Sequence, residues 1–171
     1  MDAATIALLI VALVILQRLA ELVLARRNTA RLIAEEGAYE VGAGHYPLMI
    51  ALHTGWLTTM LVLAWTADAI HWPLVGVFLV LQMGRIWVLA TLGRYWTTRI
   101  IVVPDAPMIR RGPFRFLRHP NYCIVAGEIA ILPLALGSWK AAAAFTIANA
   151  AVLFIRIRAE DAANRVRDQA A

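Results

Sequence analysis

The chain has 171 residues, 61% of them hydrophobic, and a mean hydropathy of +0.70. A soluble domain of this size has too little interior to hide so large an apolar share, so the composition excludes an ordinary soluble protein and indicates an integral membrane protein. The net charge of +5 does not point to nucleic acid, because basic residues flanking membrane spans give the same excess, and one cysteine with four scattered histidines predicts neither an intrachain disulfide nor a metal site.

Five apolar segments follow one another along the chain. A helix of about 20 apolar residues crosses a bilayer, and the fourth segment is the shortest of the five. Only Gly137 and Ser138 separate the last two segments, which predicts a tight antiparallel hairpin. The expected fold is a single all-α membrane domain over residues 1–171 with five transmembrane helices. Their approximate spans are 5–25, 47–67, 73–92, 122–136 and 139–157.

The distribution of basic residues predicts how these helices are oriented. Arginines crowd the segments 26–46 and 93–121 and the polar C-terminal tail 158–171, whereas Lys140 is the only basic residue in the loops on the other side. The positive-inside rule then places the N-terminus outside and the C-terminus inside. Function is expected on this inner face, where the long and chemically varied loops lie.

The inner segment 93–121 is expected to form an ordered, mostly irregular cap. Pro104 and Pro113 exclude one continuous helix through it. Residues 99–103, with the sequence RIIVV, have strand propensity, but a lone strand in a small helical protein would be marginal.

Charged residues within the predicted spans are costly in lipid, so each needs a partner or a polar surrounding. Arg18 and Glu21 are three residues apart on one helix face and are expected to pair with each other. Arg85 either snorkels to the interface or belongs to a site. Glu128 cannot snorkel far, so it is protonated, paired or facing a polar cavity, and we assign it a site-lining, catalytic role.

Two histidines are candidates for contact with a substrate. His45 lies just before the second apolar segment, and His53 lies about two turns inside it. His53 either forms a hydrogen bond within the bundle or contacts the substrate. Together with Arg85, these histidines form the predicted substrate-binding set.

The sequence GPFRFLRHPNY, residues 112–122, is a polar and aromatic stretch between apolar runs. Pro120 favours the first position of a helix and makes His119 the expected N-cap. The free N–H groups of such a first turn, beside Arg118, suit a carboxylate or phosphate, and Tyr122 offers a flat surface to a ring. A basic loop that binds lipid head groups has many of the same parts.

The sequence RIRAED, residues 156–161, is a second polar cluster. Arg156 and Glu160 are four apart on one helix face, next to Asp161. An exposed charged tail is the alternative interpretation. Because the hairpin begins near Pro120 and ends near Arg156, the two clusters are expected to meet in one pocket.

These two motifs, in this order and on either side of a short hairpin, resemble the isoprenylcysteine carboxyl methyltransferase family of integral membrane methyltransferases. The resemblance covers about residues 94–165, and GHYPLMIALHTGWL, residues 44–57, is similar to a small bacterial branch linked to type III polyketide synthases. It implies methyl transfer from S-adenosylmethionine, with S-adenosylhomocysteine as product, to a lipophilic acceptor such as an isoprenylcysteine or a long-chain pyrone or resorcinol. It also implies a bacterial cytoplasmic membrane with the active site on its cytoplasmic side, and a polyketide synthase as a working partner.

The resemblance also implies roles for single residues. Arg156 would orient the acceptor, while Glu128 remains our candidate base for a phenolic acceptor. Asp161 stands where the family more often has a second glutamate, a change that keeps the charge. The positions that match the family's cofactor-binding motifs are Arg118, His119, Pro120, Tyr122, Glu160 and Asp161.

Two other functions are consistent with the sequence. A phospholipid N-methyltransferase has a similar C-terminal pattern. A small membrane transporter or scaffold would need polar groups through the depth of the bundle, whereas here the polar residues crowd one side.

Overall fold

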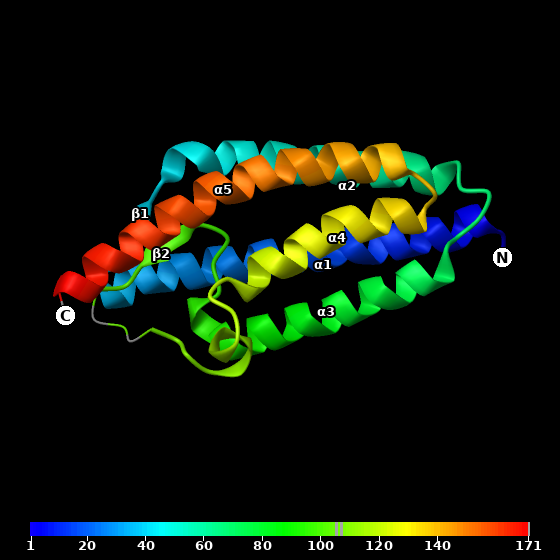
Figure 1. Ribbon diagram of the computed structural model, residues 1–171. Coiled ribbons are helices and arrows are strands. Elements are labelled where there is room, and N and C mark those ends of the chain that lie inside the picture. Colours follow the sequence, from blue (N-terminus) through cyan, green and yellow to red (C-terminus); the bar gives the residue numbers. More distant parts are fainter. Residues whose placement is uncertain (105, 107, 171) are drawn as a thin grey trace.

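The computed structural model describes the backbone of residues 1–104, 106 and 108–170, and side chains within residues 1–104, 106 and 108–165. Its described residues form five α-helices, a two-stranded sheet and three short 3-10 turns (Figure 1). The expected all-α architecture is confirmed. In chain order the regular elements are α1 (Ala3–Glu36), β1 (Tyr39–Val41), α2 (Tyr46–Trp65), α3 (Trp72–Leu92), β2 (Ile100–Val102), α4 (Pro120–Ala135) and α5 (Trp139–Ala170).

Four of these helices, α1, α2, α3 and α5, are long and apolar enough to cross a membrane. The fourth helix of the chain, α4, has 16 residues and contains Pro133, so it is apolar but shorter than a full span. Prolines near their starts help α2, α3 and α4 to begin, because a proline there removes an N–H that has no helical partner. The α4–α5 hairpin is confirmed, and Gly137, with a φ of 80°, provides its left-handed turn.

Residues from four helices share the main apolar core. Trp56 and Met60 of α2 pack with Phe78 of α3 and Ile129 of α4. The small residue Ala7 lies with them and lets α1 approach closely. Figure 1 shows α2 and α5 side by side, with α4 between them and α3.

The predicted cap contains more regular structure than expected. Residues Ile100–Val102 form β2, which pairs antiparallel with β1 in the register Tyr39↔Val102. The lone strand that seemed marginal therefore has a partner, supplied by the segment after α1. The 3-10 turns Ala43–His45, Gly93–Tyr95 and Gly112–Arg115 complete this end of the bundle.

The first and last helices both extend past their predicted spans. Helix α1 continues to Glu36, where Gly37 in the left-handed conformation ends it. Helix α5 continues through the predicted polar tail to Ala170, and residue 171 lies outside the described residues. Both extensions point to the end of the bundle that carries the sheet, opposite the N-terminus (Figure 1). We call this end, which the two strands mark, the sheet end.

Candidate active site

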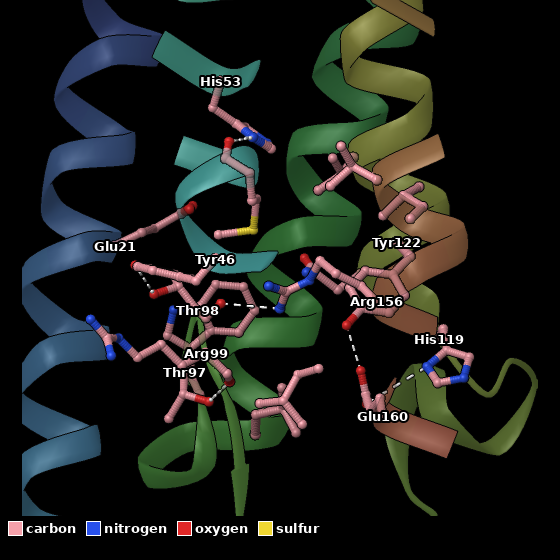
Figure 2. Close-up of a pocket in the computed structure, with 18 of the residues that line it drawn as sticks. Glu21, Tyr46, His53, Thr97, Thr98, Arg99, His119, Tyr122, Arg156 and Glu160 are labelled. Atoms are coloured by element: carbon pink, nitrogen blue, oxygen red, sulfur yellow. Dashed lines mark hydrogen bonds and ion pairs between the residues drawn. The ribbon is translucent and has the colours of Figure 1, made fainter. Parts of the chain in front are cut away.

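A cavity of about 340 Å³ lies between the helices near the sheet end. All five helices and the α3–α4 connection contribute to its lining. Its polar residues include Tyr46, Thr98, Tyr122 and Arg156, drawn in Figure 2. Deeper in the bundle the lining gains many apolar residues, beside a few charged and polar ones; the apolar residues include Met49, Ile50, Trp56, Leu57, Val125, Val152 and Leu153.

The two sequence motifs meet at one edge of this cavity. His119 is the N-cap residue of α4, as predicted, and its Nε2 lies 3.1 Å from Asp161 Oδ1. Its Nδ1 lies 3.7 Å from Glu160 Oε1. Tyr122, in the first turn of α4, donates a hydrogen bond to Glu160 and stacks on His119 with ring centroids 5.3 Å apart. The start of α4 is thus tied to the late turns of α5, two segments far apart in sequence.

The two carboxylates change the protonation of the histidine. Glu160 and the nearer Asp161 raise the pKa of His119 above its ordinary value, although partial burial opposes this shift. His119 therefore favours its protonated form more than a free histidine does. A cation between two carboxylates fixes the positions of both acidic side chains.

Arg156 projects from α5 into the cavity and is only 5% exposed (Figure 2). Its Nη2 donates a hydrogen bond to the Thr98 carbonyl at 3.0 Å. Its Nε and Nη1 are buried and have no hydrogen-bond partner among the described residues. A buried guanidinium with free N–H groups is suited to bind an anionic oxygen, because leaving them unpaired is costly. Tyr46 Oη of α2 lies 3.1 Å from Thr98 Oγ1 and so contacts the same residue, two positions before β2.

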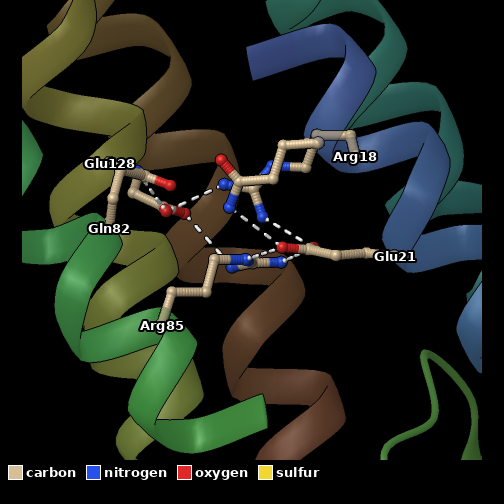
Figure 3. A network of polar contacts seen from close by, with 6 residues as sticks. Arg18, Glu21, Gln82, Arg85 and Glu128 are labelled. Carbon is tan, nitrogen blue, oxygen red and sulfur yellow. Dashed lines mark hydrogen bonds and ion pairs between the residues drawn. The ribbon is translucent and has the colours of Figure 1, made fainter. Parts of the chain in front are cut away.

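A second polar cluster lies deeper in the bundle (Figure 3). We call it the charged network; its members are Arg18, Glu21, Gln82, Arg85 and Glu128. Arg85 Nε donates to Glu21 Oε1 at 2.6 Å, and its Nη1 lies 3.3 Å from Glu128 Oε2. Arg18 bridges the same two carboxylates, with contacts of 3.1 Å to Glu21 and 2.8 Å to Glu128. Gln82 Nε2 adds a hydrogen bond of 2.8 Å to Glu128 Oε1. Two arginines and two glutamates thus form a closed ring without net charge.

The structure brings most of the predicted site residues together. Of the cofactor-binding set, Asp161 alone is not among the described residues that line the cavity, although it contacts His119. Arg118 lines the cavity edge and is exposed to solvent. His53 and Arg85 of the predicted substrate set line the cavity, whereas His45 does not.

Glu128 lies apart from the cavity lining. Its side chain is 3% exposed and is held by Arg18, Gln82 and Arg85. Of the two carboxylates in the charged network, Glu21 is the one that reaches the cavity. The expected Arg18–Glu21 pair is confirmed at 3.1 Å. Arg85 does not snorkel, since it is 6% exposed and fully engaged in ion pairs.

Three further polar residues that line the cavity were not predicted. They are Trp96, Asn121 and Asn149, each with a buried polar atom that has no partner among the described residues. One signal for Asn149 was available, because it is an amide in an otherwise apolar span, seven residues before Arg156 and so on the same helix face. Trp96 lies in a connection whose course the sequence did not reveal.

Comparisons with known proteins agree with this arrangement. The sequence model described as the isoprenylcysteine carboxyl methyltransferase (ICMT) family matches residues 74–164, which run from α3 to the late turns of α5 and include both motifs. The chain is also similar to the uncharacterized protein YpbQ of Bacillus subtilis (strain 168), with 38% identity over 159 residues, 91% of this chain and 94% of that protein. No solved structure matches the chain.

Proposed function

Because the chain belongs to the isoprenylcysteine carboxyl methyltransferase family, we propose that this membrane methyltransferase uses S-adenosylmethionine to methylate a carboxylate or hydroxyl group of a lipophilic acceptor. The observation that carries the proposal is the cavity itself. Its polar edge is built from both motifs, and its apolar part continues between membrane-spanning helices. A soluble cofactor and a lipophilic acceptor can meet only in a site of this mixed kind.

The polar edge fits the chemistry of S-adenosylmethionine. Carboxylates such as Glu160 and Asp161 accept hydrogen bonds from ribose hydroxyls, and the backbone N–H of Asn121, in the first turn of α4, has no hydrogen-bond partner among the described residues and can donate to a carboxylate. Asn121 Oδ1 is buried without a described partner and can accept from an amino group. When bound, S-adenosylmethionine supplies an electrophilic methyl group on a sulfonium. His119 and Tyr122 would hold Glu160 in its binding position.

Arg156 is the residue that would orient the acceptor. Its Nε and Nη1, which have no hydrogen-bond partner among the described residues, can hold an anionic oxygen, and the Thr98 carbonyl fixes the direction of the guanidinium. The apolar lining would exclude water from that oxygen and leave it more reactive. An ionised carboxylate or acidic enol reacts without a base, so a base is required only for a weakly acidic hydroxyl.

Glu128 would then act indirectly, through other residues, without contact with the reacting atoms. It contacts Arg18 and Arg85, and both of these line the cavity. A base must reach the proton that it removes, which favours a positioning role for Glu128 over direct proton transfer. Glu21, the network carboxylate that lines the cavity, is fully engaged by the same two arginines.

The kind of membrane and the orientation of the protein in it are also part of the proposal. Exposed arginines such as Arg27, Arg111 and Arg118 surround the sheet end, which favours a cytoplasmic opening of the cavity. The bacterial relative is consistent with a bacterial cytoplasmic membrane. A polyketide synthase partner stays a prediction from the resemblance.

Binding of S-adenosylhomocysteine to the purified protein tests the proposal. Glu160→Gln should weaken binding at least about tenfold in calorimetry, because the neutral amide is a weaker acceptor and loses the pairing with His119. Glu35→Gln is the matched control, since Glu35 is an exposed glutamate of α1 in a surface pair. Equal affinity of wild type and Glu160→Gln for S-adenosylhomocysteine would show that the cofactor does not bind at this edge of the cavity.

A further inference from the structure

Asn149 is a polar residue in the apolar part of the cavity. It lies on α5, lines the cavity and is 2% exposed. Its Oδ1 is buried and has no hydrogen-bond partner among the described residues. An unpaired buried amide destabilises a fold. Its presence in a membrane-spanning helix therefore indicates that a bound ligand supplies the missing hydrogen bond.

His53 is a second polar residue that lines the same cavity. Its Nδ1 lies 2.9 Å from the Met49 carbonyl, which can only accept, so Nδ1 carries the proton (Figure 2). In the neutral ring Nε2 is then left as an acceptor. His53 lines the cavity from α2, the helix that runs beside α5, which carries Asn149.

Both residues lie deeper in the bundle than the polar edge of the cavity. Asn149 precedes Arg156 by seven residues of continuous helix, which corresponds to about 10 Å along α5. The lining between them includes the apolar residues Val152 and Leu153. Two polar positions are therefore separated by an apolar stretch on one wall of the cavity.

We propose that the acceptor carries a second hydrogen-bonding group, a hydroxyl, about 10 Å from the group that is methylated, and that Asn149 and His53 bind it. The inference rests on the proposed function, because it takes Arg156 as the residue that holds the methylated end. A hydroxyl fits both residues, because its O–H can donate to Asn149 Oδ1 or to His53 Nε2, and its oxygen can accept from Asn149 Nδ2.

The charges nearby favour a neutral group at this position. Arg18 and Arg85 also line the cavity, but each is paired with Glu21 and Glu128 in a network without net charge. No excess charge is left to compensate an ionised ligand group in the apolar part. Asn149 and His53 are accordingly specificity-determining residues for a lipophilic acceptor that is hydroxylated within its apolar portion.

The test compares two probes that differ by one hydroxyl. Octadecanoic acid and its mid-chain hydroxy derivative, with the hydroxyl about 10 Å from the carboxylate along the extended chain, are titrated into the protein in lipid nanodiscs with S-adenosylhomocysteine present. Wild type should bind the hydroxy acid about tenfold more tightly. A third acid with its hydroxyl at the far end of the chain should gain nothing.

Two variants link this preference to the proposed residues. Asn149→Leu and His53→Phe should each reduce the ratio of the two affinities to near one, while octadecanoic acid itself still binds. Leu153→Ala is the matched control, because it removes an apolar group from the same wall and should weaken both acids alike.

Equal affinities of wild type for the two acids, or no saturable binding of the hydroxy acid, would overturn the inference. A preference that survives in both Asn149→Leu and His53→Phe would overturn it as well. Failure of the proposed function looks different, because S-adenosylhomocysteine would then not bind and no acceptor would be methylated, whatever the ratio of the two acids.

Discussion

The charged network and the polar edge of the cavity both contain arginines and glutamates, yet they differ in how completely these side chains are paired. In the charged network each arginine contacts both carboxylates, and Gln82 supports one of them. At the polar edge two guanidinium nitrogens of Arg156 and the side-chain oxygen of Asn121 have no hydrogen-bond partner among the described residues. In the charged network each buried charge is compensated, so removal of one partner is costly, whereas the unpaired donors and acceptors of the polar edge are suited to a ligand.

The largest expected effect is a loss of protein stability when the charged network is broken. Arg85→Met would leave Glu21 and Glu128 with Arg18 as their remaining cation, and breaking a buried pair of this kind costs about 3–5 kcal/mol. Unfolding in detergent, followed by tryptophan fluorescence, measures the loss. Arg31→Met is the control, because Arg31 and Glu35 form an exposed pair that contributes about 1 kcal/mol or less. Equal losses in the two variants would show that the ring does not stabilise the bundle.

The next largest expected effect concerns methyl transfer at the polar edge of the cavity. Arg156→Gln should lower kcat/KM for methyl transfer about 100-fold, because an acceptor oxygen that is not held loses both alignment and charge stabilisation. Arg158→Gln, two residues further along α5 and exposed, should stay within about twofold of wild type. Similar activity of these two variants would mean that the free N–H groups of Arg156 do not serve the reaction.

The smallest effect is a pH dependence at the polar edge. The raised pKa of His119 means that its pairing with Glu160 and Asp161 stabilises the fold fully below pH 6.5, its ordinary pKa, and that this stability is lost as the pH rises through the raised value. His119→Gln should therefore cost up to about 1 kcal/mol in acid and progressively less in alkali, after allowance for solvent screening. Thermal unfolding of both proteins across this pH range measures the difference. A cost that grows with pH would contradict the assignment.

The sequence predicts the helices and much of the polar edge, but it does not predict which charged side chains pair between helices. The five apolar segments, the hairpin at Gly137 and the meeting of His119 with Asp161 all follow from local rules of length, turn chemistry and helix spacing. Glu128 was assigned to the cavity, but which partner a buried carboxylate takes depends on helix packing. Neither Arg18 nor Arg85 is near Glu128 in sequence.

The partner strand of β2 and the unpaired amide of Asn149 are two further features that the sequence does not predict. Strand propensity identified the RIIVV segment, yet its partner Tyr39–Val41 has a sequence that gave no strand signal strong enough to predict. Asn149 was overlooked because a single amide in an apolar run has many ordinary explanations. Only the cavity around it distinguishes a free amide from a satisfied one.

Transfer of a labelled methyl group tests the central claim most directly. Membranes that contain the wild-type protein, or Glu160→Gln, are incubated with S-adenosylmethionine labelled in its methyl group, and the lipid-soluble products are separated and counted. The account predicts label in a lipid-soluble product with wild type and its loss with Glu160→Gln. Absence of label with wild type, or equal label with the variant, would contradict a methyltransferase site at this cavity.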